Sequence, residues 1–92
     1  MSTPRFEVVR TGGHYSAFAG RTIGSRWHAR FRGANGRIVW TTETYTRRRA
    51  ALAAIELLSS GPATLGVDDR WRIRQRDSLV VEIRDVDERS AQ

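Results

Sequence analysis

The stretch SRWHARFRGANGRIVWTTE, residues 25–43, decides the fold, because it predicts two strands joined by a tight turn. Trp27, Ala29 and Phe31 alternate with polar side chains, the pattern of a half-buried strand. The dipeptide Asn35-Gly36 follows this strand. It is a strong hairpin signal, since a type I′ turn requires positive φ at both central residues. We therefore predict a β-hairpin with a two-residue loop.

That loop fixes which residues of the two strands lie opposite one another. The predicted pairs are Phe31 with Trp40, Ala29 with Thr42, and His28 with Glu43. The first two pairs lie on the same face, so the hydrophobic pattern and the turn agree. A cross-strand pair such as His28 and Glu43 is more often an exposed ion pair than a catalytic acid and base.

The hairpin is flanked by a first strand and a helix. The expected elements are a strand at 6–11, a glycine-rich loop at 12–24, and a helix at about 47–59 that Thr44 or Thr46 caps and Gly61-Pro62 ends. One helix face is apolar, and its members are Ala50, Ala51, Ala54, Ile55 and Leu58. Leu52 lies off this stripe, so we expect it to need a different partner.

Two further strands are predicted after the helix, at 70–75 and 79–86. A three-residue turn at 76–78 keeps their apolar residues on one face. It pairs Ile73 with Val81, Trp71 with Ile83, and Arg72 with Glu82. The alternative is that no hairpin forms and the last strand leaves for another chain. A frayed tail is expected from Asp87.

Together these elements predict one α+β domain over residues 1–92. Its antiparallel sheet has about five strands in the order β-β-β-α-β-β, with the single helix packed on one face. The residues expected to be mostly buried are Trp27, Phe31, Trp40, Ala50, Ala54, Ile55, Leu58, Trp71 and Ile73.

The stretch from Ala34 to Tyr45, followed by the basic, alanine-containing segment from Arg47 to Glu56, resembles the YegP-like family. The features shared are the Asn-Gly hairpin, the Thr-Glu pair, the Tyr and the helix that ends near Ile55-Glu56. The family has no established activity. The resemblance implies a β-β-β-α-β unit that pairs, in tandem or as a homodimer, with exchanged C-terminal strands. This chain differs in its longer loop at 12–24, its additional strand at 70–76 and Ala54, where the family often has glycine.

A looser resemblance is to the small three-stranded domains at the N-termini of phage integrases. It rests on a strand with Trp27, Arg30 and Arg32, then a hairpin and an alanine-rich helix. Those domains lay their sheet in a DNA groove.

Composition narrows the classes of function. The chain has 92 residues and no cysteine, which leaves His14 and His28 as the imidazole ligands for a metal, so we expect no metal site. No segment has the length of a membrane span or the pattern of a signal peptide, and a cytoplasmic protein is expected. There is no lysine and hence no Walker A loop, and no nucleophile elbow is present. We expect no enzymatic activity, no cofactor and no small-molecule substrate.

The charge is asymmetric. Residues 1–49 contain ten arginines and two acidic residues, a balance of +8, whereas residues 50–92 contain six arginines and eight acidic residues, a balance of −2. Arginines at two-residue spacing in strands can meet successive phosphates, and a helix N-terminus offers free N–H groups to an anion. The candidate anion-binding residues are Arg26, Arg30, Arg32, Arg47, Arg48, Arg49, Arg70, Arg72, Arg74 and Arg76.

Two hypotheses follow. In the first, the domain binds DNA, RNA or another polyanion through the phosphates, using an arginine-lined sheet face. In the second, it is a structural or protein-interaction module that forms a homodimer through its sheet edges and Leu52. Glu7, Glu43 and Glu82 are expected on the arginine face and neutralise part of it, with Glu82 paired to Arg72.

Overall fold

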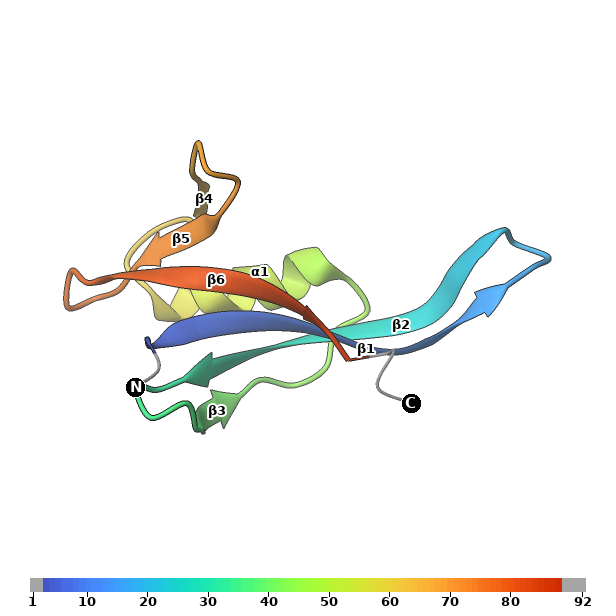
Figure 1. Ribbon diagram of the computed structural model, residues 1–92, viewed down its shortest axis with the longest axis horizontal. Coiled ribbons are helices and arrows are strands. Elements are labelled where there is room, and N and C mark those ends of the chain that lie inside the picture. The colour runs from blue at the N-terminus through green and yellow to red at the C-terminus, as the bar shows by residue number, and fades with distance from the viewer. Residues whose placement is uncertain (1–2, 89–92) are drawn as a thin grey trace.

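A computed structural model describes residues 3–88, without the side chains of residues 14, 15 and 22. The elements are β1 (Arg5–Ser16), β2 (Arg21–Arg32), β3 (Ile38–Thr41), α1 (Arg48–Leu58), β4 (Thr64–Leu65), β5 (Trp71–Arg74) and β6 (Val80–Asp87). The strands form one six-stranded sheet in the order β3-β2-β1-β6-β5-β4. Helix α1 lies along one side of the sheet (Figure 1). The α+β class with one helix is confirmed.

The prediction of about five antiparallel strands is wrong in two respects. The short strand β4 adds a sixth member at one edge. The N-terminal strand β1 lies in the middle of the sheet and pairs in parallel with β6, with Phe6 opposite Ile83. A parallel pair joins strands that are distant in sequence, and the local pattern of neither strand indicates it. The last strand therefore pairs within its own chain.

The first hairpin has the predicted register but a different turn. Gly36 is left-handed, with φ of 80°, whereas Asn35 is not, so the turn is not type I′. The N–H of Gly36 donates to the carbonyl of Gly33 (2.9 Å), and the N–H of Gly33 donates to the carbonyl of Arg37 (3.0 Å). These bonds close a three-residue loop, an arrangement in which the left-handed residue forms a bulge.

A β-bulge then restores the predicted pairing. Arg32 lies opposite Ile38 but Phe31 lies opposite Trp40, so Val39 is the additional residue. The ring centroids of Phe31 and Trp40 are 6.2 Å apart, and Phe6 lies 5.0 Å from Phe31. Because this aromatic cluster must stay on the core face, the extra residue is accommodated in the backbone.

The second hairpin confirms the three-residue turn at 76–78. The N–H of Gln75 donates to the carbonyl of Leu79 (2.8 Å), and Ser78 is left-handed with φ of 73°. The register pairs Trp71 with Ile83, Arg72 with Glu82, and Ile73 with Val81, as predicted.

The core lies between the sheet and α1. It contains Phe6, Val8, Ala29, Ala51, Ile55, Ile73, Val81 and Ile83. Of the predicted core residues, Ile55 and Ile73 are buried, while the three tryptophans and Phe31 are half-buried and pack against this cluster. Ala50 and Ala54 are also half-buried. Leu58 is 53% exposed, so its predicted place in the core is wrong; it is the last residue of the helix.

The start of the helix differs from the prediction. Arg47 is the N-cap residue, and no side chain within residues 3–88 caps the helix, so neither Thr44 nor Thr46 has that role. Leu52 is partly buried and packs against the core cluster. This contact is the different partner that we expected for a residue off the apolar stripe.

The segment 12–24 is not a loop. Strands β1 and β2 continue as a two-stranded ribbon, with His14 opposite Ile23 and Ser16 opposite Arg21. We call residues 11–26, where no third strand is paired, the arm. The arm projects from the sheet (Figure 1) and gives the domain a long axis of 47 Å, against 26 and 25 Å for the others.

The C-terminal tail is ordered further than expected. Asp87 belongs to β6, and the N–H of Glu88 donates to the carbonyl of Arg10 (2.9 Å). Residues 89–92, which the predicted frayed tail also included, lie outside the described residues. The helix present in residues 3–88 is too short and too polar to cross a membrane.

Candidate nucleic-acid interface

The sheet has one face toward α1 and one face away from it, which we call the open face. Arg30 lies opposite Glu7, and Arg72 lies opposite Glu82. Since Phe31 and Ile73 point toward the helix, these charged neighbours point to the open face. The structure therefore brings the two predicted rows of arginines onto one face.

In the first row, Arg30 and Arg32 share one carboxylate. Glu7 accepts hydrogen bonds from the Nε atoms of Arg30 (2.5 Å), Arg32 (2.9 Å) and Arg5 (3.0 Å). Glu88 adds two contacts of 3.3 Å to the terminal nitrogens of Arg30. Arg30 is only 7% exposed, so it has little surface to offer a phosphate.

The environment of Glu7 explains how a carboxylate stays charged there. Burial alone would raise its pKa, because a charged group loses solvation in the interior. Hydrogen bonds from the three guanidinium groups outweigh burial and hold the pKa of Glu7 below its ordinary value. The Glu7 cluster is thus a structural ion network in the middle of the sheet.

The second row is paired differently from the prediction. Arg72 donates two hydrogen bonds to Asp68, at 2.6 and 3.1 Å, and these lower the pKa of Asp68 to about 2. Glu82 instead accepts from Arg84 (2.8 Å) and lies 3.9 Å from Arg70. The expected pairing of Glu82 with Arg72 is wrong, because the turn before β5 folds Asp68 back along that strand.

At the start of α1, one of three arginines is paired. Arg48 donates to both oxygens of Asp85, at 2.8 and 3.0 Å, and its guanidinium lies 5.9 Å from the Trp71 ring centroid. Arg47 and Arg49 are exposed. Asp85, rather than Glu43, is thus the acid that neutralises this end of the helix.

His28 and Glu43 do not form the expected pair. After Thr42, which bonds to Ala29, the next bridge joins Trp27 to Tyr45 and leaves an extra residue between them. Glu43 is exposed, and no bond between it and His28 occurs in residues 3–88. Burial and Arg30 lower the pKa of His28, while Glu88 acts against them.

Several arginines remain without a carboxylate partner or other side-chain bond within the described part of the chain. They are Arg21 and Arg26 on the arm, Arg37 after the first turn, Arg47 and Arg49 at the helix start, and Arg76 in the second turn. Arg74 donates only to the carbonyl of Ser78 (3.1 Å). Arg21 and Arg37 were not among the predicted site residues, because Arg21 lies in the segment predicted as a loop and Arg37 directly follows the predicted turn.

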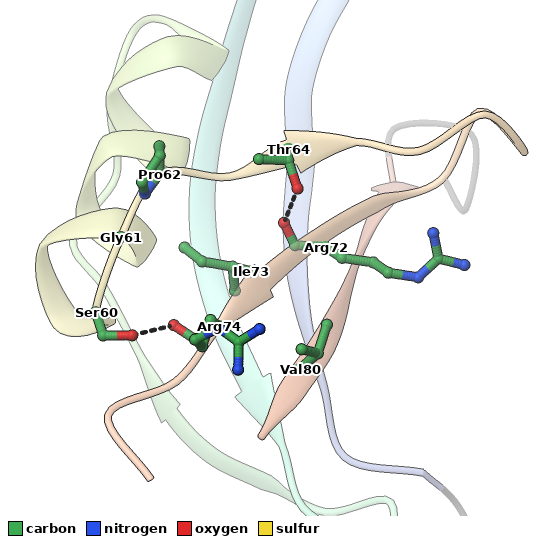
Figure 2. Close-up of a pocket in the computed structure, with 8 residues that line it drawn as sticks. All are labelled: Ser60, Gly61, Pro62, Thr64, Arg72, Ile73, Arg74 and Val80. Atoms are coloured by element: carbon green, nitrogen blue, oxygen red, sulfur yellow. Dashed lines mark hydrogen bonds between the residues drawn. The ribbon is translucent and has the colours of Figure 1, made fainter. Parts of the chain in front are cut away.

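A hollow of about 390 Å³ lies between the end of α1 and strand β5 and is open to solvent (Figure 2). Pro62, Ile73 and Val80 line it. Its polar groups already bond within the domain: the Ser60 hydroxyl donates to the carbonyl of Arg74 (3.0 Å), and the Arg72 guanidinium is held by Asp68. It therefore offers few free groups to a ligand.

The fold thus defines a small α+β domain with one helix on a mixed sheet, and its candidate site is a surface of cations rather than a cleft. Residues 24–69, half of the chain, match the family model described as a domain of unknown function (DUF1508), which is the YegP-like family. The chain belongs to this family. Comparisons with curated proteins and with solved structures gave no match.

Proposed function

We propose that this domain binds nucleic acid through its phosphates, as a module without enzymatic activity. One observation carries the proposal. Between Glu7 and Glu43 the chain contains six arginines and no acidic residue. Of these arginines, Arg21 and Arg26 lie on a projecting ribbon and have no partner among the described residues. A surface of this kind attracts phosphate and favours rapid association.

The binding surface differs from the predicted sheet face. The arginines at the centre of the open face are held by Glu7, Glu82 and Asp68, whereas Arg21 and Arg26 on the arm and Arg47 and Arg49 at the helix start have no carboxylate partner among the described residues. A two-stranded ribbon has dimensions that fit the major groove of DNA. We therefore assign the main contacts to the arm, with Arg47 and Arg49 as additional cations.

Salt-dependent binding tests this proposal. Fluorescence anisotropy would be measured with random-sequence duplex DNA, single-stranded DNA and RNA over a range of salt concentrations. For duplex DNA we expect log affinity to fall linearly with log salt, with a slope of about −0.9 per phosphate neutralised. Competition by heparin would show whether other polyanions use the same surface.

A pair of double variants locates the surface. Arg21→Gln with Arg26→Gln removes two unpaired charges, and Arg72→Gln with Arg84→Gln removes two paired ones. We expect the first to flatten the salt slope by about two units and the second by much less. Absence of binding at low salt, or equal effects of the two double variants, would contradict the proposal.

A second candidate function is self-association. Strand β3 is an edge strand, and its Ile38 and Val39 are 47% and 62% exposed. Unpaired N–H and C=O groups on such an edge can pair with a second copy. Light scattering would test it: we expect a mass near twice 10.4 kDa that Val39→Lys returns to the monomer value. A monomer at high concentration would contradict this candidate.

A further inference from the structure

A small hollow lies where the arm leaves the sheet, on the side of the helix. It has a volume of about 220 Å³, and we call it the arm hollow. Its lining includes Arg10 from β1, Arg21, Ser25 and Trp27 from β2, and Thr46 from the segment before α1. None of the residues that line it is acidic.

Strand geometry explains why these side chains meet. Arg21, Ser25 and Trp27 are separated by even numbers of residues, so they share one face of β2. Arg10 lies opposite Trp27 in the neighbouring strand. Two backbone hydrogen bonds between Trp27 and Tyr45, of 2.7 and 2.9 Å, hold the residue before Thr46 against β2. The hollow is therefore built on paired strands.

The two arginines that line the arm hollow differ in their contacts. The Nε of Arg10 donates to the Ser25 hydroxyl (3.1 Å), and its guanidinium lies 5.4 Å from the Trp27 ring centroid. These contacts orient Arg10 before any ligand arrives, which reduces the entropy lost on binding. Arg21 is exposed and has no bonded partner among the described residues.

A neighbouring hollow shares Arg10 and Trp27 and is also lined by Arg48, Asp85 and Asp87, and Asp87 lies opposite Arg10 in the β1–β6 register. Asp85 is held there by the two hydrogen bonds from Arg48. The arm hollow thus combines guanidinium donors and hydroxyl groups with an aromatic wall. Its volume is below the range of sites for drug-sized ligands and suits a phosphate group with part of a sugar.

We infer that the arm hollow is a phosphate subsite, in which the guanidinium groups of Arg10 and Arg21 bind the oxygens of one phosphate. The inference rests on the proposed function in one respect: the phosphate is taken to be that of a nucleic-acid strand that continues along the arm. Guanidinium groups are suited to this ligand because their N–H donors can bind two phosphate oxygens at once.

NMR titration of the full chain tests the subsite. Inorganic phosphate, a nucleoside 5′-monophosphate, the same nucleoside without phosphate, and a short single-stranded oligonucleotide would be added separately, while the side-chain N–H signals of arginines and Trp27 are followed. We expect saturable shifts of the Arg10, Arg21 and Trp27 signals with all three phosphates, and none with the nucleoside. The oligonucleotide should bind most tightly if the strand is the ligand, and the mononucleotide if a free nucleotide is.

The variant Arg21→Gln should weaken phosphate binding by about tenfold, the effect of losing one charged hydrogen bond. Arg84→Gln, which removes a charge already paired with Glu82, is the matched control and should change the affinity by less than twofold. Shifts spread evenly over all exposed arginines, or an unchanged affinity in Arg21→Gln, would overturn the subsite.

Different results would contradict the phosphate subsite and the proposed binding of nucleic acid. If oligonucleotide binds and Arg21→Gln weakens it no more than Arg84→Gln does, the subsite is wrong and the proposed function stands. If mononucleotide and inorganic phosphate bind in the arm hollow but no oligonucleotide binds, the subsite stands and the proposed function is wrong.

Discussion

The inner part of the β1–β2 ribbon, residues 5–10 with 27–32, lies inside the six-stranded sheet, whereas in the described part of the chain no third strand pairs with the arm. One continuous register joins them, from Arg5 opposite Arg32 to Ser16 opposite Arg21. In the inner part, Phe6, Val8 and Val9 are almost fully buried. At the tip of the arm, Phe18 is fully exposed.

This difference shows that two strands can stay paired along their whole length although only one part of the pair is buried. An isolated two-stranded hairpin is marginally stable in water. The arm is therefore held by the inner ribbon from which it extends, and its own side chains remain available for a partner. The inner part provides stability and the arm provides surface.

Replacing the two phenylalanines should give the largest contrast. Phe6→Ala removes a ring from the core cluster, and we expect a loss of about 3–5 kcal/mol in the free energy of unfolding. Phe18→Ala removes the same atoms from solvent and should change it by less than about 0.5 kcal/mol. Urea unfolding followed by tryptophan fluorescence measures both. Similar losses in the two variants would show that the arm is part of the cooperative core.

The next effect concerns the ion network of the inner ribbon. Glu7→Gln keeps the shape of the side chain but leaves Arg5, Arg30 and Arg32 without their shared carboxylate. Removing one partner from a buried network should lower the free energy of unfolding by about 3 kcal/mol. Glu82→Gln, at a partly exposed carboxylate on the same face, is the control and should cost less. Equal losses would mean that Glu7 has no special role.

A smaller and local effect is expected from Gly13→Ala in the arm. Gly13 has φ of 83°, and an added Cβ would lie 2.6 Å from the Ser25 hydroxyl oxygen and 3.2 Å from the Ile23 carbonyl oxygen. A side chain in the left-handed region costs about 1–2 kcal/mol. Hydrogen exchange should therefore accelerate at arm amides and stay unchanged in the inner ribbon. Faster exchange throughout β1 would contradict the separation into two parts.

The pH dependence of stability should give the smallest signal. The pKa of Glu7 is lowered in the folded state from its ordinary value of 4.5, so its contribution is complete above that pH. The contribution is lost as the pH falls from 4.5 through the folded-state pKa. The wild-type protein should therefore lose stability more steeply than Glu7→Gln in this window. Asp68, with its pKa of about 2, is present in both proteins, so its contribution cancels when the two stability curves are compared. Parallel curves would show that Glu7 titrates normally.

The prediction of a loop at 12–24 was wrong, because the arm lacks the sequence signal of a strand. The sequence signal for a strand is an alternation of apolar and polar residues, and that alternation reflects burial of one face. The arm buries neither face as the inner ribbon does, so it lacks the alternation and its glycines suggest a loop. Its pairing is imposed from outside, by the register of residues 5–10.

The hairpins were predictable for the opposite reason. Phe31 opposite Trp40 and Ile73 opposite Val81 follow from the need to keep apolar side chains on one face, and both registers are observed. The type I′ turn at Asn35-Gly36 was wrong, yet the bulge at Val39 preserved the register. Burial of the aromatic cluster therefore determined the pairing more strongly than the turn did.

The sequence by itself determined the helix, the two hairpin registers, the family and the excess of arginine in the first half of the chain. The tertiary structure alone decided which arginines are neutralised. Ion pairs depend on separations of a few ångströms, and these are set by the strand order that places Glu7 between Arg30 and Arg84. Because β1 and β6 lie near opposite ends of the sequence, no local sequence pattern shows that they are neighbours in the sheet. Five sheet arginines are therefore held by carboxylates, namely Arg5, Arg30, Arg32, Arg72 and Arg84. Arg21 and Arg26 of the arm have no such partner among the described residues.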